Sequence, residues 1–412
     1  MALWTDALHL ANGRKVNVER VLFVVNSEEF GGLEIVLLDW LSGIDYSRVS
    51  VALCYRADIL KERLIAKGLP VETVKLNVPN HEPRWKEFWK WCRIFSSVRA
   101  QKIVLMEGGF GDLELATILA ARLSTSGSVF VFAGGGGTSA PADVAKGKRK
   151  LHFGFLPGIG WHRYKERIRQ KLRSRLLARS FVSSQELKDN LNAWFGFVRD
   201  RLSVLYHGSD TSRFRPSSAE RADYRLSVGI PQDAVVIVSH GRLAPVKRVD
   251  RILKSFSVLS PENPNLWLLM TSYGPLKDEV ERTVASSERY RRVKLVGFQE
   301  DAAALLKAAD VYVLASDREG FGIALIEAMS TGLACVATNC HGPAGIIVNG
   351  ENGILVEAAD EAVLAGLRRA LLLGPEERLR LVTEARKTVE ERFEIHTAVR
   401  RALESMGIPS SR

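Results

Sequence analysis

The feature that most constrains the fold of this chain is a twofold alternation of short apolar runs, rich in β-branched residues, with stretches of helical periodicity. In the first half the runs are Val21–Asn26, Val49–Tyr55, Lys102–Met106, Val129–Ala133 and Ser203–Tyr206. In the second half they are Ala234–Ser239, Leu266–Thr271, Val293–Val296, Val311–Ala315, Ala334–Thr338 and Gly353–Val356. Strands that alternate with helices favour parallel βαβ units, and continuously apolar strands are typical of a sheet covered by helices on both faces. The sequence therefore predicts an α/β protein with two doubly wound, Rossmann-like domains.

A polar, turn-rich segment separates the two halves. It is Tyr206–Pro216, followed by a charged stretch to Ile230, and we interpret it as the linker. The N-terminal domain then takes residues 1–208 and the C-terminal domain residues 209–393. The pattern is strongly helical from Pro375 onward. We expect the last helix, about residues 394–412, to pack back on the N-terminal domain.

Composition excludes several classes of protein. With 46% hydrophobic and 25% charged residues, the chain can bury a core, which excludes a disordered protein. No apolar run approaches the ~18–20 residues that a membrane-spanning helix needs, and the first residues lack the apolar centre of a signal peptide. The four cysteines form no CxxC pair. These observations favour a reducing, cytoplasmic setting.

The basic charge is concentrated in one segment. The chain has 58 Lys and Arg against 47 Asp and Glu, a net charge of +11. Residues 146–179 alone contain 12 basic residues and one acidic residue, which gives the same +11. Inside this segment an apolar stripe recurs at helical spacing, at Trp161, Tyr164, Ile168, Leu172 and Leu176.

Two interpretations of this basic segment remain open. It is either an ordinary helix that packs its stripe on the sheet, or a surface for anionic lipid headgroups at the inner membrane face. In the second case each nearby Lys or Arg contributes about 1 kcal/mol, and the apolar anchors are Phe153, Phe155, Leu156 and Trp161. Nucleic acid is not expected as a partner, because no recognition motif accompanies the charge.

Two cations follow the first strand of the second half. In the stretch SHGRLAPVK, Arg242 and Lys247 lie five residues apart across a turn that contains Pro245. Open α/β sheets bind ligands at the carboxyl ends of their strands, so these two side chains suit a diphosphate. The alternative is a pair of solvated surface cations.

A second loop, SDREGFGIALIE, follows another strand. A helix is predicted to begin near Phe321 and Gly322, which leaves the amides of Gly322, Ile323 and Ala324 free as an anion site. Glu327 comes about one turn into this helix, near enough to accept hydrogen bonds from a ribose, and Glu319 lies just outside it. The alternative makes Glu319 a helix cap and Glu327 a solvated residue.

A third glycine-containing turn, EEFGGLE, lies after the first strand. Gly31 and Gly32 permit a close approach of the backbone to a ligand, but the turn lacks both the GxGxxG spacing and the lysine of a P-loop. Other absences are informative as well. The chain has no Asp-x-Asp pair, no His/Cys cluster with zinc spacing and no Gly-x-Ser-x-Gly elbow. No metal site is expected.

These stretches occur in a fixed order with several other motifs: Gly31-Gly32-x-Glu34, the linker His207–Pro216, Gly241-Arg242-Leu243 with Lys247, Ser272–Pro275, Leu295–Phe298, Glu319 and Glu327 with Ala328-Met329, His341–Pro343 and Asn352-Gly353. In this order they resemble the family 4 glycosyltransferases, retaining enzymes of the GT-B fold, in which two Rossmann-like domains face a central cleft. The resemblance spans roughly residues 20–395 and is tighter in the second half.

The resemblance implies transfer of a sugar from a nucleotide-diphosphate sugar to a glycan or lipid-linked acceptor, as in polysaccharide biosynthesis. No cofactor or metal ion is implied, because cations and a helix N-terminus stabilise the leaving diphosphate. The implied roles are a diphosphate clamp for Arg242 and Lys247, a ribose site for Glu327, and a sugar site for Glu319 with the amides of Phe321 and Gly322. Further donor contacts are implied for Gly32, Gly241, Gly297, Phe298 and Gln299.

The chain departs from the family pattern on the acceptor side. The family carries a histidine at the end of an N-domain strand, whereas this chain has Ala133 there, before Gly134. Ser272 and His207 also replace a Gly and an Asn of the pattern. The alternative function is therefore a catalytically silent GT-B protein that binds a nucleotide sugar or glycan as a partner or scaffold. An epimerase or a phosphorylase is a weaker option, and the absence of a pyridoxal-phosphate lysine motif counts against the phosphorylase.

Overall fold

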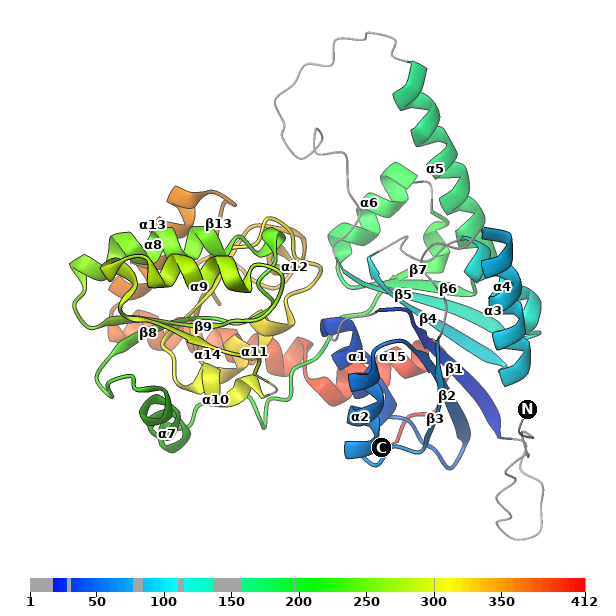
Figure 1. Cartoon of the computed structure of the whole chain (residues 1–412), viewed down its shortest axis with the longest axis horizontal. Coiled ribbons are helices and arrows are strands. Elements are labelled where there is room, and N and C mark those ends of the chain that lie inside the picture. Colours follow the sequence, from blue (N-terminus) through cyan, green and yellow to red (C-terminus); the bar gives the residue numbers. More distant parts are fainter. Residues whose placement is uncertain are drawn as a thin grey trace.

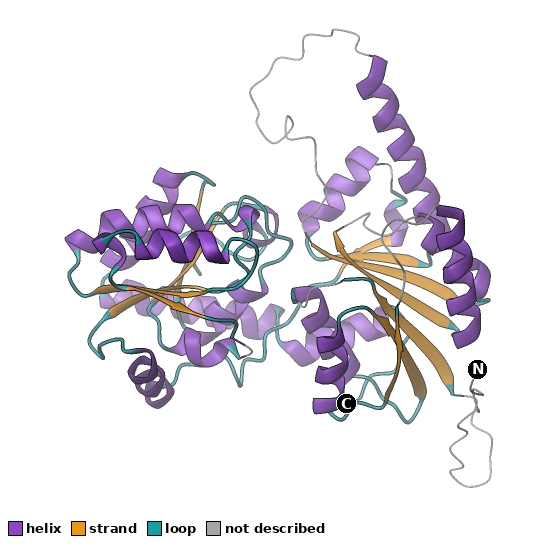
Figure 2. Cartoon of the chain, in the orientation of Figure 1, coloured by secondary structure: helices purple, strands orange, loops and turns teal. Residues whose placement is uncertain are grey.

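The computed structural model describes residues 18–27, 31–76, 84–109, 115–135, 157–195, 197–299 and 301–411. Each half of the chain forms a parallel sheet with helices on both faces (Figures 1 and 2). This arrangement confirms the predicted α/β class with two doubly wound domains.

The N-terminal sheet has seven parallel strands in the order β3-β2-β1-β4-β5-β6-β7. The strands are β1 Glu19–Val25, β2 Val49–Tyr55, β3 Val71–Lys75, β4 Lys102–Gly109, β5 Ser128–Gly135, β6 Arg179–Val182 and β7 Leu202–Val204. The helices are α1 Gly32–Ser42, α2 Asp58–Ala66, α3 Arg84–Val98, α4 Leu115–Ser124, α5 Pro157–Leu176 and α6 Gln185–Phe195, and a short 3-10 turn spans Arg199–Arg201.

The C-terminal sheet has six parallel strands in the order β10-β9-β8-β11-β12-β13. The strands are β8 Val235–Ser239, β9 Leu266–Thr271, β10 Val293–Val296, β11 Val311–Leu314, β12 Ala334–Thr338 and β13 Ile354–Val356. The helices are α7 Ser218–Val228, α8 Val249–Glu262, α9 Lys277–Ala285, α10 Ala302–Lys307, α11 Ile323–Thr331, α12 His341–Ala344, α13 Asp360–Leu372, α14 Pro375–Arg392 and α15 Ile395–Ser405, with 3-10 turns at Pro245–Lys247 and Glu288–Tyr290.

The continuous apolar character of the strands follows from burial on both faces. In β1, Val21 and Phe23 face the layer of α1, α2 and α15, whereas Leu22 and Val24 face the layer of α3 and α4. Both sheets reverse strand order at their middle, between β1 and β4 and between β8 and β11. Such a switch point opens a crevice at the carboxyl ends of the strands. The loops that follow β8 and β11 lie at this crevice.

The charged stretch before Ile230 is a helix, so its interpretation as part of the linker was wrong. α7 begins at the cap Ser217, whose hydroxyl accepts from the Glu220 amide, and ends at Gly229 with a φ of 69°. Its charge is partly internal, because Arg225 is fully buried. The Arg225 guanidinium donates to the carbonyls of Ala308 and Ala234, each at 2.8 Å.

The chain crosses between the domains twice, and the two crossings lie side by side. The Ser209 amide donates to the Phe393 carbonyl at 2.8 Å, and the Ile395 amide donates to the Ser209 carbonyl at 3.2 Å. After this second crossing, α15 packs on α1 (Figure 1). Its buried side chains Val399 and Leu403 join the core of the N-terminal sheet.

The basic helix α5 packs through a different face from the predicted stripe. Ile168 and Leu172 are 44% and 45% exposed, whereas Gln170, Arg173 and Ser174 are buried. Packing of the stripe on the sheet is therefore wrong for these two side chains. The side chains of Trp161 and Tyr164, and all of residues 136–156, lie outside the described part. No helix in the described ranges has the length and apolar character needed to cross a membrane.

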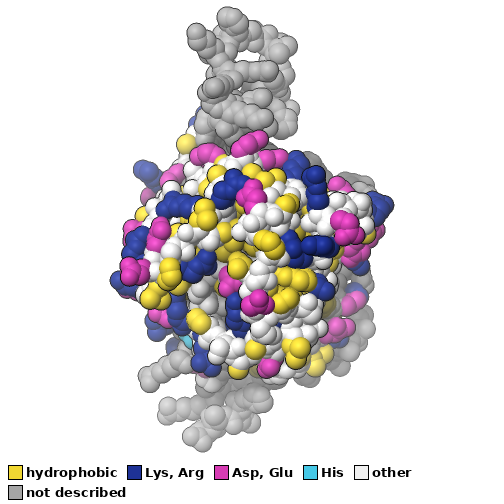
Figure 3. All heavy atoms as spheres, turned by 90° about the vertical axis from the view of Figure 1, so that its left-hand side faces the viewer, with side chains coloured by type: hydrophobic (Ala, Val, Ile, Leu, Met, Phe, Trp, Pro, Cys, Tyr) yellow, Lys and Arg dark blue, Asp and Glu magenta, His cyan; other side chains and the backbone are white. Residues whose placement is uncertain are grey.

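The two domains also differ in surface charge. The face of the C-terminal domain seen in Figure 3 mixes Lys and Arg with Asp and Glu over its whole area. This agrees with the sequence, in which the net charge of residues 146–179 equals that of the whole chain.

Candidate functional site

The first part of the site is the loop between β11 and α11, residues 315–322, which we call the Glu319 loop. It ends at the helix cap Gly322, whose φ of 106° is left-handed and disfavours any side chain. The amides of Leu325 and Ile326 bond to the Gly322 carbonyl. The preceding amides, of Ile323 and Ala324, have no intrahelical acceptor and lie at the positive, N-terminal end of the helix dipole. This end of α11 is therefore suited to an anion.

The Glu319 loop is held from inside the C-terminal domain. The Gly342 amide, in α12, donates to the Glu319 carbonyl at 3.0 Å. A Cβ at Gly342 would lie 2.2 Å from the Phe321 carbonyl oxygen, so a glycine is required for this approach. The Phe321 ring is buried against Tyr206, His207 and Phe393, with ring centroids 5.2–5.7 Å apart.

One of the two predicted cations, Lys247, contacts this loop. The ammonium group of Lys247, in the turn after β8, forms an ion pair with the Glu319 carboxylate. The two loops are joined by a hydrogen bond of 2.9 Å from the Asp317 amide to the Val246 carbonyl. Arg242 is exposed on the same loop as Lys247. Gly241 has a φ of 144°, and its amide and carbonyl both bond to the Thr271 hydroxyl at 3.0 Å.

Glu327 is placed deeper, on the side of the site that faces the linker. Burial raises the pKa of its carboxyl to about 8, while the nearby charge of Arg213 acts in the opposite direction. The neighbouring Tyr273 is affected electrostatically by both Arg242 and Glu327, and burial raises the pKa of its hydroxyl. Tyr273 also contacts Phe298 edge-on at 5.1 Å. Glu327, Arg242 and the Gly297–Phe298 turn are thus parts of one neighbourhood.

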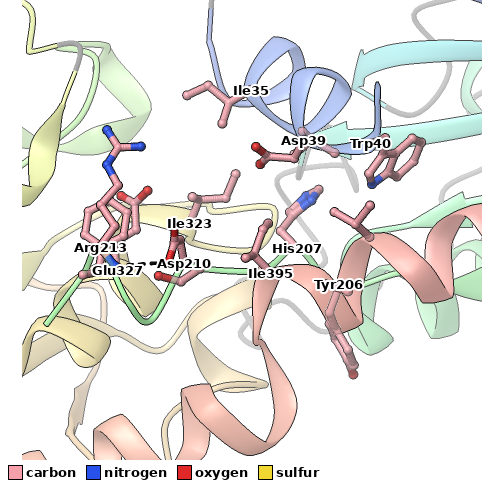
Figure 4. A pocket seen from close by; sticks show the side chains of 16 residues that line it. Ile35, Asp39, Trp40, Tyr206, His207, Asp210, Arg213, Ile323, Glu327 and Ile395 are labelled. Atoms are coloured by element: carbon pink, nitrogen blue, oxygen red, sulfur yellow. Dashed lines mark hydrogen bonds between the residues drawn. The ribbon is translucent and has the colours of Figure 1, made fainter. Parts of the chain in front are cut away.

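A cavity of about 80 Å³ adjoins Glu327 between the domains. It is lined by α1, the linker, α11 and α15, and Figure 4 shows Asp39 pointing into it across from Glu327 and Arg213. Its lining combines charged groups, among them Asp39, Arg213 and Glu327, with apolar side chains of α1, α11 and α15. Burial raises the pKa of Asp39 to about 6. The sequence did not point to Asp39, because its proximity to Glu327 comes from the packing of two domains, nor to Arg213, which lies in the turn-rich segment before α7.

The N-terminal domain supplies the opposite wall. Gly31 caps α1, and its amide donates to the Glu34 carboxylate at 2.8 Å. Gly32 is exposed, and a Cβ there would lie 3.6 Å from the Ile323 side chain. The early glycines therefore face the first residue of α11.

The strand end where the family pattern has a histidine is apolar here. Ala133 is fully buried. At the end of the neighbouring strand β4, Glu107 forms a buried ion pair with Arg173 of α5. His207 of the linker packs between Phe132 and Phe321, and burial lowers the pKa of its imidazole to about 4. His207 is thus a neutral aromatic spacer between the domains.

The order of these loops along the C-terminal sheet is matched by a protein family. Residues 220–388 match the family model described as "Glycosyl transferases group 1". The match covers 169 of the 412 residues, all of them in the C-terminal domain. The match includes Arg242, Lys247, Glu319 and Glu327, whereas Gly31, Gly32 and Ala133 lie outside it.

Curated relatives match about half of the chain, and solved structures extend the likeness in fold to nearly all of it. A D-inositol 3-phosphate glycosyltransferase of Streptomyces avermitilis is 29% identical over 202 residues, which cover 46% of this chain and 43% of the relative. The chain thus spans about half the length of the curated relatives it matches. A glycosyltransferase from Rickettsia africae superposes with a TM-score of 0.73 at 17% identity, covering 95% of this chain and 98% of that one. Anabaena HepE, solved with UDP and glucose, gives a TM-score of 0.72 at 19% identity, covering 94% and 98%. These likenesses confirm the GT-B fold.

Within the described residues, no three His, Cys, Asp or Glu side chains cluster in an arrangement that could hold a metal ion. The charged groups around the Glu319 loop include Lys247, which pairs with Glu319, and Arg242, together with the N-terminal end of α11 and the carboxyl of Glu327. Such a set can bind and orient a diphosphate and a sugar together.

Proposed function

We propose that this protein is a retaining family 4 glycosyltransferase that moves a sugar from a nucleotide-diphosphate sugar to a glycan or lipid-linked acceptor. The observation that carries this proposal is the convergence of Lys247, Glu319 and the N-terminus of α11 at the switch point of the C-terminal sheet. The match of residues 220–388 to the group 1 glycosyl transferase model supports it.

The proposed chemistry follows from the charges. Departure of the nucleoside diphosphate leaves negative charge on its oxygens, and the amides of α11 with Arg242 and Lys247 stabilise that charge without a metal ion. Without donor, Lys247 is held by Glu319. The diphosphate takes over Lys247, which frees the Glu319 carboxylate to bind the sugar. Glu327, with the neighbouring Tyr273 and Phe298, receives the nucleoside.

The test compares two lysines. Lys247→Ala should lower turnover of the donor about 10²–10³-fold, the usual cost of losing one group that stabilises developing charge. Lys254→Ala is the matched control, because Lys254 is exposed and pairs with Asp360 on α13. UDP-glucose is the first donor to assay, since HepE was solved with UDP-glucose, followed by GDP- and ADP-sugars. Equal activity of the two variants would remove the site assignment.

The independence from metal ions and the retention of configuration are each tested by a separate measurement. Activity that persists in excess EDTA supports a mechanism without metal, and loss that Mg²⁺ or Mn²⁺ restores contradicts it. The anomeric configuration of the product, read by NMR before it equilibrates, decides whether the donor configuration is retained.

A catalytically silent protein remains the second candidate, and Ala133 is the observation that favours it. It predicts donor binding by calorimetry with neither hydrolysis nor transfer across a panel of acceptors. Transfer to any acceptor excludes this candidate.

We also propose that α5 brings the enzyme to an anionic membrane surface. Arg167, Lys171 and Arg175 are exposed beside Ile168 and Leu172, and the N-terminal end of α5 projects from its domain (Figure 1). A cationic helix with exposed apolar groups fits an anionic interface. Arg173 is excluded from this surface because it is buried in its pair with Glu107.

The vesicle test uses these exposed cations. Replacing Arg167, Lys171 and Arg175 by Glu should abolish sedimentation with phosphatidylserine vesicles while soluble donor turnover stays unchanged. Vesicle binding that survives the triple replacement would remove the membrane proposal and leave the donor site untouched.

A further inference from the structure

Ser183 makes a hydrogen-bonding contact between the two domains. It follows directly after β6 and its side chain is fully buried. Its hydroxyl oxygen lies 3.1 Å from the carbonyl oxygen of Gly320 and 3.3 Å from that of Gly134. Gly320 belongs to the Glu319 loop of the C-terminal domain and Gly134 to β5 of the N-terminal domain. A hydroxyl has a single hydrogen, so Ser183 donates to one of these carbonyls at a time.

The contact reaches the loop that carries the proposed sugar-binding carboxylate. Gly320 adjoins Glu319, whose own carbonyl is bonded from the other side by the Gly342 amide at 3.0 Å. The Glu319 loop is therefore held by a backbone group of its own domain and by a side chain of the opposite domain. The hydrogen bond from Ser183 exists only while the two domains are in contact.

A second contact from the same segment strengthens the first. Glu186, in the first turn of α6, lies 3.6 Å from the Nε2 atom of His341, and His341 precedes Gly342 in α12. These atoms form an ion pair when the imidazole is protonated. The segment Ser183–Glu186 thus contacts both the Glu319 loop and the helix that supports it.

We propose that Ser183 is a positioning residue, whose hydroxyl donates to the Gly320 carbonyl while the two domains are in contact and thereby fixes the Glu319 loop. It acts beside Ala133–Gly134, the strand end that departs from the family pattern. The inference rests on the proposed function for its effect on catalysis, whereas the contact itself is independent of that function.

The test compares adjacent serines. Ser183→Ala removes the contact between the domains, whereas Ser184→Ala removes a hydroxyl that accepts from the Leu187 amide inside α6. Ser183→Ala should lower kcat about fivefold to tenfold, the factor expected from one lost hydrogen bond, and leave the dissociation constant of the donor within twofold. Ser184→Ala should lower the melting temperature without changing kcat.

Hydrogen exchange gives a second readout that needs no turnover. Amides of residues 317–324 should exchange faster in Ser183→Ala than in the wild type and in Ser184→Ala, with UDP present and without it. Unchanged exchange of this segment would overturn the proposal, and so would an unchanged kcat in an active enzyme. If the wild type transfers no sugar, the proposed function fails, and the exchange measurement still decides whether Ser183 holds the loop.

Discussion

At the scale of single residues, the carboxyl of Glu327 combines a proposed binding role with a cost to stability. Its pKa rises from 4.5 to about 8 because burial disfavours the charged form. Between these two values the folded protein binds a proton that the unfolded chain releases. The free energy of unfolding therefore falls as the pH rises from about 4.5 to 8, and the loss is complete above that range.

Glu327→Gln should remove this pH dependence, because an amide carries no charge at any of these pH values. We expect the variant and the wild type to have similar free energies of unfolding at pH 4.5. At pH 9 the variant should be more stable than the wild type by roughly 1–3 kcal/mol, which is less than the full free energy that linkage assigns to a pKa shift of this size. Urea unfolding at both pH values measures the difference. The exposed Glu391→Gln is the control, and a difference between variant and wild type that does not grow with pH would contradict the burial argument.

Gly342 gives a second prediction at this scale. Gly342→Ala places a Cβ 2.2 Å from the Phe321 carbonyl oxygen, so α12 or the Glu319 loop must move, at about 1–3 kcal/mol. We expect a lower melting temperature and a loss of donor turnover. Gly345→Ala, in the same short segment, meets its nearest atom at 3.4 Å and should keep both. Equal behaviour of the two variants would show that the loop tolerates the shift.

The sequence predicted those site residues whose positions follow from local structure. Lys247 and Glu319 each lie in the loop that follows an apolar strand, so their meeting follows from the parallel sheet. Asp39 and Ser183 reach the site through the packing of one domain on the other, whereas Arg213 comes from the turn-rich segment that precedes α7. The burial of Glu327 has the same origin, which is why a solvated helix residue was an equally valid interpretation of its sequence.

At the scale of secondary-structure elements, prediction failed where burial is partial or charge is internal. β3 is the edge strand of its sheet, and its sequence VETVK alternates polar and apolar residues. β6 has four residues and follows a cationic helix. α7 and α5 read as charged surface segments, yet Arg225 and Arg173 are fully buried. A sequence pattern does not show which arginine of a basic run turns inward.

The buried pair between α5 and β4 gives a prediction for that helix. Glu107→Ala removes the carboxylate from a fully buried Arg173, and loss of one partner of a buried pair costs about 3–5 kcal/mol. Lys171→Ala, two residues from Arg173 and on the exposed face of α5, should change the free energy of unfolding by less than about 0.5 kcal/mol. Chemical unfolding checks both variants. Equal free energies of unfolding for the Glu107→Ala and Lys171→Ala variants would mean that Arg173 does not anchor α5.

At the scale of the whole molecule, the two domains are joined by paired crossings rather than by a single tether. Gly208 packs so closely on the second crossing that a Cβ there would lie 2.4 Å from the Ile395 Cα atom. The aromatic contacts of Phe132, His207 and Phe321 continue across the same region. Rotation of one domain against the other therefore has to turn both crossings together and to break the contacts that Ser183 and Glu186 make with the C-terminal domain.

The second crossing makes the N-terminal core depend on the end of the chain. Ending the chain after Phe393 removes α15 and the residues that follow it, including buried Leu403, Met406 and Ile408. Each such side chain contributes about 1.5–3 kcal/mol when buried, so their sum is comparable to the ~5–15 kcal/mol of a whole domain. Calorimetry should show the N-terminal domain unfolded in the truncated chain, while the transition of the C-terminal domain persists.

Two point variants distinguish the effect of losing buried side chains of α15 from the effect of losing the second crossing. Leu403→Ala keeps the crossing intact and should destabilise the N-terminal domain by about 2–5 kcal/mol, whereas Arg401→Ala, exposed on the same helix, should have little effect. If Leu403→Ala shifted the transition of the C-terminal domain instead, α15 would belong energetically to that domain. If it lowered the unfolding temperatures of both domains equally, the two domains would unfold as one cooperative unit.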